Sequence, residues 1–573
     1  MTTLLWQHLP CDDDQAIALA AALNVHSTIA RLLCMRGFND PERASRFLNP
    51  TLEHLNDPFR LADMDKAIPR LERAVALREK IAIHGDYDVD GITSTVILRR
   101  ALEMLGGDVI HFLPERMRDG YGLQPAAIDR LHAQGVRLIV SVDCGIRAGD
   151  AADRARALGV DLIITDHHEP EGTLPRAFAV INPKRADCTY PDKYLAGVGV
   201  ALKVVQALCD RAGKNKWLPA FVKIAAIGTL ADVVPLVGEN RVIARHGLAS
   251  LSSGPHAVGL RALLDACGLT GKTIDSYHVG FMIAPRVNAA GRMSTPDIAA
   301  RLLLATDEAM GDEARALARQ LCDENVRRQQ EEAELVTQAK RAIETDPAVG
   351  AHTVLVVGGL GWHRGVIGIA ASKLVDTYHK PSIVLSIDGD VAHGSCRSIP
   401  DFDLLAALAH CSDLFVKFGG HKQAAGLTME AARVPEFRAR VNAYANALIQ
   451  PDQLRPRLRI DAPLNLKSIT QDLVRGLELL GPFGLANPRP VFHASGVEIV
   501  DGPRTIKERH LKMTFAQDGR RFRAMAWRSA ERAGFLETHR AAMNLAFSVD
   551  RNEYQGETYL ELLVADFKAM DDQ

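Results

Sequence analysis

The sequence predicts a multidomain α/β protein that ends in a small β-barrel. Strand-like and helical segments alternate from Lys80 onward, which indicates a parallel, doubly wound sheet. Residues 306–346 contain no proline and are rich in charged side chains, which indicates one long solvated helix. From about residue 455, short segments of alternating polar and apolar residues are separated by turns, a pattern typical of a barrel such as an OB-fold.

These patterns divide the chain into segments. The long helix could be a surface helix of one domain, but its place between two α/β patterns favours a connector. The segments are 1–75, a helical lead-in; 76–300, a parallel-sheet domain; 301–346, the long connecting helix; 347–450, a smaller α/β domain; and 451–573, the barrel.

Composition limits the classes of protein that remain. The chain has 573 residues, enough for about four domains, and its 47% hydrophobic and 24% charged residues are ordinary globular values. The 68 basic and 70 acidic residues leave a net charge of −2, so any nucleic-acid site must be a local basic patch.

The cysteine pattern and the apolar segments bear on where the protein works. Nine scattered cysteines without a C-x-x-C pair argue against a disulfide framework and a structural zinc site. We expect a reducing, cytoplasmic setting. The sequence shows no signal peptide and no apolar stretch of 18 residues, so we expect no membrane span.

Acidic residues and histidines follow the predicted strands. Because the carboxyl ends of parallel strands open on one crevice, residues far apart in sequence can converge there. Asp232 follows a further apolar run and could join them. The candidates are His84, Asp86, Asp88 and Asp90 after the first strand, Asp143 after a later one, the Asp166-His167-His168 triplet after the next, and Asp232.

This set of side chains favours a site for divalent metal ions. Several carboxylates in one crevice repel each other unless a cation neutralises them. Carboxylates with imidazoles suit Mn²⁺ or Mg²⁺, and the lack of cysteine ligands weakens the case for zinc. Two such ions can promote phosphoryl transfer. Taken alone, Asp90 could be only a helix cap and the paired histidines only a loop; their occurrence together favours the metal site.

The smaller α/β domain contains a glycine-rich segment. Gly419, Gly420 and His421 precede Lys422 and a predicted helix start, so backbone N–H groups there could bind a phosphate. Ser395 and Arg397 could add donors. The alternative is that the glycines only form a tight turn.

The predicted barrel carries a basic patch. Between Arg504 and Arg528 there are eight basic and two acidic residues, a net charge of +6. Interleaved aromatic residues could stack bases of a single strand, although each could instead belong to the core. The basic residues we expect to contact DNA are Lys507, Arg509, Lys512, Arg521 and Arg523.

Several motifs resemble known families. HGDYDVDGITS, SVDCG, TDHHE and ADVVP resemble the four motifs of the DHH phosphoesterase superfamily. PRVNAAGRM (285–293), GSCRS (394–398), FGGHKQAAGLT (418–428) and GPFGLANPRPVF (481–492) resemble the RecJ family of single-strand-specific exonucleases, over nearly the whole chain from about residue 50. Cys396 and Ala486 stand where that family tends to have a small residue and a glycine; neither change removes a reactive group.

The resemblance implies roles for particular residues. It implies that the 76–300 segment is a DHH domain and that 347–450 is a DHHA1 domain that holds the nucleotide. The implied metal ligands are His84, Asp88, Asp90, Asp143, His167 and Asp232, with Asp86 and His168 supporting them or moving a proton. The implied substrate-binding residues are Arg286, Asn288, Arg292, Ser395, Arg397, Gly419, Gly420 and His421.

The resemblance also implies an activity. It implies a 5′→3′ exonuclease that uses two Mn²⁺ or Mg²⁺ ions to release 5′-mononucleotides from single-stranded DNA. It further implies a monomer that acts in recombination and repair beside a single-strand-binding protein and a helicase. Two alternatives remain. A superfamily phosphoesterase acting on pyrophosphate or short oligonucleotides would lack the basic barrel, and a non-catalytic DNA-binding scaffold would have eroded acidic motifs.

Overall fold

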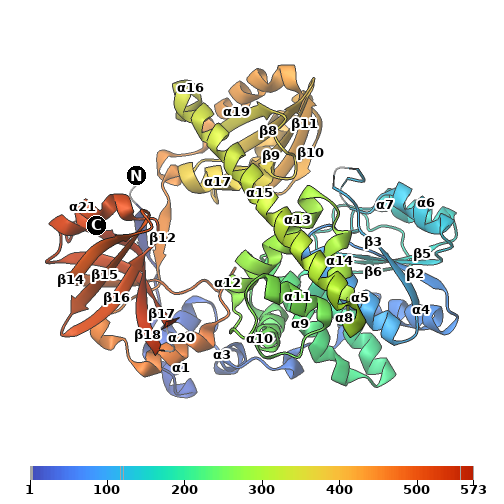
Figure 1. The fold of residues 1–573 in the computed structure, drawn as a ribbon, viewed down its shortest axis with the longest axis horizontal. Coiled ribbons are helices and arrows are strands. Elements are labelled where there is room, and N and C mark those ends of the chain that lie inside the picture. Colours follow the sequence, from blue (N-terminus) through green and yellow to red (C-terminus); the bar gives the residue numbers. More distant parts are fainter. Residues whose placement is uncertain (1–3, 117, 121, 555–556, 572–573) are drawn as a thin grey trace. The chain divides into compact units, whose positions relative to one another are not determined.

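The computed structural model describes residues 4–116, 118–120, 122–554 and 557–571 (Figure 1). They form two compact units. The barrel unit comprises residues 1–56, 233–246 and 457–573, and the sheet unit comprises residues 57–232 and 247–456. The barrel unit is therefore assembled from three separate stretches of the chain.

The first sheet of the sheet unit has five parallel strands in the order β3-β2-β4-β5-β6, so the predicted parallel sheet is confirmed. Every residue of the central strand β4 is buried, as expected for a sheet covered on both faces. The strands are β2 (Lys80–His84), β3 (Asp108–Phe112), β4 (Leu138–Val142), β5 (Asp161–Thr165) and β6 (Ala179–Ile181). The accompanying helices are α4 (Met64–Ala76), α5 (Val89–Met104), α6 (Pro125–Ala133), α7 (Gly149–Ala157), α8 (Gly197–Ala212) and α9 (Leu218–Ala231).

A helical layer follows and leads into one long helix, as predicted. The long helix is α15 (Gly311–Thr345), 35 residues, which packs against α11 and α13 near its start and against α17 and β7 further on. It begins later than residue 301 because α14 ends at Leu304 and the Asp307 side chain caps a separate short turn. The preceding helices are α10 (Gly238–Ser253), α11 (Val258–Ala266), α12 (Ser276–His278), α13 (Ala284–Met293) and α14 (Asp297–Leu304).

The second sheet has the order β10-β11-β9-β8-β7, in which only β7 and β8 are parallel. The expectation of a helix after His421 was wrong: β10 and β11 form a hairpin. Ala425, Leu427 and Met429 alternate into the core, a period of two that fits a strand. The elements are β7 (Leu355–Leu360), α17 (Ile367–Tyr378), β8 (Ser382–Asp388), β9 (Val391–Arg397), α18 (Leu404–His410), β10 (Phe415–Gly420), β11 (Ala424–Glu430) and α19 (Val434–Leu448).

The barrel unit contains the predicted barrel. Its strands run in the order β13-β14-β15-β16-β18-β17, and β14 also pairs with β17, which closes the sheet. Apolar residues of α1–α3 and α20 share one core with the barrel strands. The elements are α1 (Asp13–Leu23), α2 (Ser27–Met35), α3 (Pro41–Leu48), β13 (Ala462–Pro463), α20 (Gln471–Leu480), β14 (Phe492–Ile506), β15 (His510–Gln517), β16 (Arg520–Ala526), α21 (Ala533–Thr538), β17 (Met543–Tyr554) and β18 (Glu557–Lys568).

Two further elements tie the ends of the barrel unit together. The N-terminal strand β1 (Leu5–His8) pairs in parallel with β12 (Arg457–Ile460).

Among the described residues, no single helix has the length and apolar character needed to cross a membrane. The helices α1 and α2 meet these two criteria only when they are taken together, as a pair bent by 119°.

Candidate metal centre

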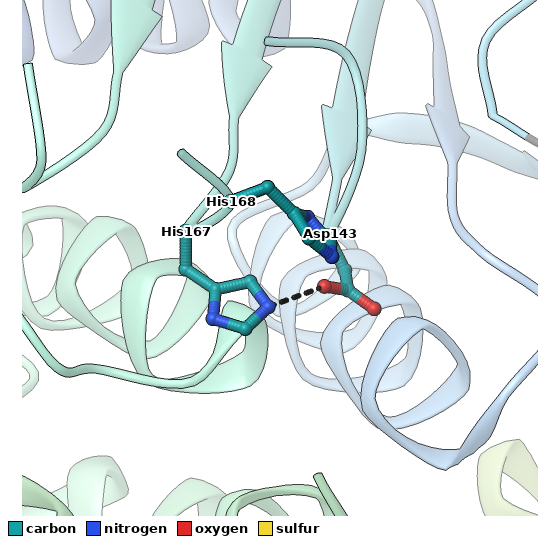
Figure 2. A group of neighbouring side chains, drawn as sticks. All are labelled: Asp143, His167 and His168. Atoms are coloured by element: carbon teal, nitrogen blue, oxygen red, sulfur yellow. Dashed lines mark ion pairs between the residues drawn. The ribbon is translucent and has the colours of Figure 1, made fainter. Parts of the chain in front are cut away.

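The carboxyl edge of the first sheet brings the predicted acidic residues and histidines together. Asp143 follows β4, His167 follows β5, and Asp232 ends α9. The Nε2 atom of His167 lies 3.2 Å from an Asp143 oxygen, 3.6 Å from an Asp232 oxygen and 3.9 Å from an Asp90 oxygen. Figure 2 shows the first of these pairs beside His168. One imidazole nitrogen therefore has three carboxylates around it.

Three overlapping sets of side chains have ligand atoms within 4.8 Å of one another, close enough to surround a metal ion. Asp143 belongs to two of these sets and so does His167, which is the sharing that two neighbouring ions require. The sets are Asp143, His167 and His168; Asp90, His167 and Asp232; and Asp86, Asp88 and Asp143.

Buried polar atoms that make no hydrogen bond lie at this edge and fit a cation. Asp143 Oδ1, His167 Nε2 and Asp232 Oδ2 are buried and make no hydrogen bond. Buried polar atoms are nearly always paired, because each unpaired one costs free energy. Carboxylate oxygens and an imidazole nitrogen are ligands that Mn²⁺ and Mg²⁺ accept, so the residues present fit a pair of divalent ions.

His84 is placed differently from the other predicted ligands. Its Nδ1 atom lies 3.6 Å from the Cys144 sulfur, and its buried Nε2 atom makes no hydrogen bond. Burial lowers the pKa of His84 to about 4, so the ring is neutral at pH 7. His84 belongs to none of the three sets found among the described residues. Its role as a ligand stays a prediction.

Asp166 orients the two histidines, a role that the sequence did not indicate. Its Oδ1 accepts hydrogen bonds from the backbone N–H of His167 at 2.7 Å and from His168 Nδ1 at 2.7 Å. Burial alone would raise the pKa of Asp166. The bond with His168, the charges of both histidines and the Ile146 N–H together outweigh burial and lower that pKa to about 2. The ionised carboxylate raises the pKa of His168 against the opposing effect of burial and leaves Nε2 as the available nitrogen.

Asp90 does not cap its own helix, so the alternative that it is only a helix cap was wrong. Asp88 caps α5, because its side chain accepts from the Gly91 N–H at 3.1 Å. The Asp90 carboxylate instead accepts the N–H groups of Gly197 and Val198 at the start of α8, both at 2.7 Å. Gly197 is required there, since a Cβ atom on it would lie 2.5 Å from an Asp143 oxygen. The first turn of α8 thus binds the Asp90 carboxylate and lies directly against Asp143, so it brings these two predicted ligands together.

The predicted substrate-binding residues of α13 have separate positions. Asn288 accepts a hydrogen bond from the Val89 N–H at 3.2 Å, which places it against the loop that carries Asp88. Arg292 donates to the Gly365 carbonyl at 3.0 Å. Arg286 donates to the Met282 carbonyl at 2.6 Å, in the turn just before α13.

The second sheet places its predicted residues on neighbouring strands. Arg397 donates to the Ser395 hydroxyl at 3.2 Å on β9, and Gly419 and Gly420 end β10. His421 forms the turn. Its pKa is lowered by burial first and then by the charges of Arg147 and His168, so it lies near the metal-binding loops.

The barrel residues lie on one hairpin and its neighbouring turn. Lys507 and Arg509 lie at the turn between β14 and β15, Lys512 is on β15, and Arg521 and Arg523 are exposed on β16. The interleaved Phe515 and Phe522 are buried in the core, so only Trp527, 58% exposed, remains available for stacking.

Two cations near the carboxylates were missed by sequence reasoning. The Arg116 guanidinium lies 4.2 Å from the centre of the Tyr87 ring. Burial and then the charge of Asp88 raise the pKa of Asp86 to about 8, and the charge of Arg116 opposes this rise. Lys184 similarly opposes the raised pKa of Asp232. The signal for Arg116 was a pair of arginines in the loop PERMRDG after the strand β3.

The crowded carboxylates predict how stability depends on pH and metal. Burial and neighbouring carboxylates raise the pKa of Asp90 to about 7 and that of Asp232 to about 9. Such groups favour the folded state when protonated, so the metal-free protein should lose stability as pH rises from about 4 to about 9. Mn²⁺ neutralises the same oxygens, so its stabilising effect should grow over that range.

Thermal unfolding with EDTA or with MnCl₂ at pH 5.5, 7.0 and 8.5 measures both effects. We expect the unfolding temperature in MnCl₂ to exceed that in EDTA by an amount that increases with pH. Equal midpoints with and without Mn²⁺ at pH 8.5 would contradict the assignment of these residues as ligands.

Three family models match the chain: the DHH family N-terminal domain over residues 80–229, the DHHA1 domain over 351–447, and the RecJ OB domain over 460–566. The single-stranded-DNA-specific exonuclease RecJ of Bacillus subtilis is 36% identical over 565 residues, which cover 98% of this chain and 70% of that protein. RecJ of Escherichia coli is 33% identical over 569 residues, which cover 94% and 95%.

Solved structures agree with the sequence comparison. The crystal structure of RecJ in complex with Mn²⁺ from Thermus thermophilus has a TM-score of 0.83 at 32% identity, covering 98% of this chain and 79% of that one. The structure of the Mg²⁺ complex from the same organism has a TM-score of 0.78 at 31% identity, covering 98% and 78%. The resemblance seen in the motifs is confirmed: this chain belongs to the RecJ family.

Proposed function

We propose that this protein is a metal-dependent exonuclease that degrades single-stranded DNA from its 5′ end and releases 5′-mononucleotides. The observation that carries the proposal is the group of buried ligand atoms of Asp143, His167 and Asp232 that make no hydrogen bond at the carboxyl edge of the parallel sheet. The RecJ relatives, which are named single-stranded-DNA-specific exonucleases, supply the substrate class.

The chain's own residues hold the site and its protons. Bound Mn²⁺ or Mg²⁺ ions would supply Lewis-acid activation of water and neutralise charge on the phosphate oxygens. Asp143 and His167 would be the shared ligands, with the other ligands Asp88, Asp90 and Asp232. Asp166 holds Nδ1 of His168, so His168 can carry a proton on Nε2 for the departing 3′ oxygen.

Cations around the carboxylates would bind the phosphate that is cut. Arg116 stacks on Tyr87, next to Asp86 and Asp88 in sequence, and Arg397 with Ser395 forms a donor pair on β9. Asn288 positions the loop through Val89. Arginine suits this task because its planar donors match phosphate oxygens.

The barrel would bind the strand beyond the cut. Its exposed basic side chains attract the phosphate backbone, and Trp527 offers a ring for stacking. A role in recombination and repair, with a single-strand-binding protein and a helicase as partners, a monomeric state and a cytoplasmic setting complete the proposal.

End-labelled oligonucleotides test the proposal. The purified protein with Mn²⁺ should release a 5′ label from single-stranded DNA as a mononucleotide before it releases a 3′ label, and should leave a matched blunt duplex intact. Early release of the 3′ label would contradict the polarity. Intact single-stranded DNA together with cleavage of pyrophosphate or dinucleotides would replace the proposal with a small-substrate phosphoesterase, and binding without any cleavage would replace it with a scaffold.

A further inference from the structure

Two aromatic side chains of the sheet unit are strongly exposed and stack on each other. Tyr277 is 61% exposed and Phe281 is 70% exposed. Their ring centres are 4.9 Å apart with 28° between the planes. Large aromatic side chains normally contribute buried area, so a stacked pair that faces solvent marks a surface that binds something flat and apolar.

The backbone around this pair is also unusual. Phe281 lies in the π-helical turn η4 (Val279–Ile283), a rare conformation that is frequent at functional sites. Val279 and Ile283 are buried in the core and anchor the turn. Gly280 lies beside Phe281, and a Cβ atom on it would meet no atom within 4 Å. Tyr277, Gly280 and Phe281 thus form an exposed face with two stacked rings beside a position that carries no side chain.

The elements that carry the rings adjoin the metal centre. α12, η4 and α13 are continuous in sequence, and η4 packs against α9, the helix that ends at Asp232. Asn288, seven residues after Phe281, contacts the Val89 N–H next to Asp88. At 1.5 Å per helical residue, the seven residues from Phe281 to Asn288 span about 10 Å along the helix. A stacked strand rises about 3.4 Å per nucleotide, so this span corresponds to about three nucleotides.

A cation on the same helix completes the surface. Arg286 follows Phe281 by five residues and is held by its bonds to the Met282 carbonyl and, at 3.3 Å, to the Cys322 sulfur. A fixed guanidinium on the segment that carries exposed rings is a combination with which proteins hold single strands, the cation for a phosphate and the rings for a base.

We propose that Tyr277 and Phe281 form a stacking platform for a base of the single-stranded substrate, a few nucleotides from the bond that is cut. The inference rests on the proposed exonuclease function. The platform would hold the strand through the base faces, which every base offers, so it adds affinity without sequence preference. Substrates too short to reach the platform would gain no affinity from it.

Steady-state kinetics on a 30-nucleotide single strand tests the platform. The double variant Tyr277→Leu/Phe281→Leu keeps the helix and the apolar bulk but removes both rings. We expect its KM to rise by about 5- to 100-fold, the range for loss of a stacked base, with kcat within about twofold of the wild type. Phe281→Tyr should keep the wild-type KM. Phe178→Leu is the control, an exposed ring (44%) directly before the edge strand β6 of the first sheet.

Photocrosslinking separates failure of the platform from failure of the exonuclease proposal. Oligonucleotides with 5-iodouracil at successive positions are irradiated with metal-free wild-type protein, and the crosslinked peptide is mapped by mass spectrometry. We expect a crosslink on Tyr277 or Phe281 from a position within the first several nucleotides of the 5′ end, whether or not the protein cuts DNA. An unchanged KM in the double variant, or crosslinks only elsewhere, would overturn the platform and leave this face to a protein partner.

Discussion

Asp143→Asn is expected to lower exonuclease activity by at least about 100-fold, because loss of groups that merely support metal ligands already costs 10- to 100-fold. Asp143 belongs to two of the three ligand sets, so its loss affects both ion positions. Its buried Oδ1 makes no hydrogen bond, so the substitution breaks none at this atom. Burial and four neighbouring carboxylates raise the pKa of Asp143, so removing its charge should not destabilise the metal-free protein.

The two effects must be measured on the same preparation. Release of a 5′ label in Mn²⁺ gives the activity, and thermal unfolding in EDTA gives the stability. Asp108→Asn is the matched control, an exposed aspartate at the amino end of β3 in the same sheet, and should keep wild-type activity. Activity within tenfold of the wild type in Asp143→Asn would contradict a shared metal ligand at this position.

Arg241→Met is expected to destabilise the barrel unit by about 2–6 kcal/mol, because two buried backbone carbonyls lose their side-chain donor and each unsatisfied group costs about 1–3 kcal/mol. Arg241 lies in α10 and is only 1% exposed. It donates to the carbonyl oxygens of Phe47, Leu479, Leu480 and Gly481 at 2.6–3.0 Å. Its guanidinium also lies 3.7 Å from the centre of the Phe47 ring. Methionine fills much of the volume but donates no hydrogen bond. The Leu480 and Gly481 carbonyls keep their bonds from Asn487 and Arg245, whereas the Phe47 and Leu479 carbonyls lose the Arg241 donor.

Hydrogen exchange measures this loss locally, which matters because a chain of several domains need not unfold in one step. Amides of α3 and α20 should exchange faster in Arg241→Met, whereas those of the parallel sheet should not change. Arg475→Met on α20 is the control, because this exposed arginine forms a surface ion pair with the equally exposed Asp472, and it should change exchange little. If the amides of α3 and α20 exchange equally slowly in Arg241→Met and Arg475→Met, the hydrogen bonds of Arg241 contribute little to the stability of the barrel unit.

The sequence predicted the parallel sheet, the long helix and the barrel because each has a distinct local period. It also predicted which acidic side chains converge, since the rule that parallel strands open on one edge needs no coordinates. The hairpin after Gly420 was missed because alternating alanine, glycine and leucine fit a strand and a helix almost equally well.

Contacts between distant parts of the chain could not be predicted. Residues 233–246 directly follow Asp232 yet belong to the barrel unit, and nothing in their composition indicates this. Leu236 donates its N–H to the Leu485 carbonyl, and Arg241 is buried there despite being charged. The role of Asp166 was hidden for a related reason, because only the folded loop shows that its oxygens face backbone N–H groups rather than the shared crevice.

The most direct test of the metal centre is a crystal structure of the protein grown with MnCl₂, with anomalous differences recorded to locate manganese. We predict two manganese peaks at the carboxyl edge of the parallel sheet, both in contact with Asp143 and each in contact with further members of the ligand sets. A map without peaks at this edge, or with manganese bound only elsewhere, would contradict the account.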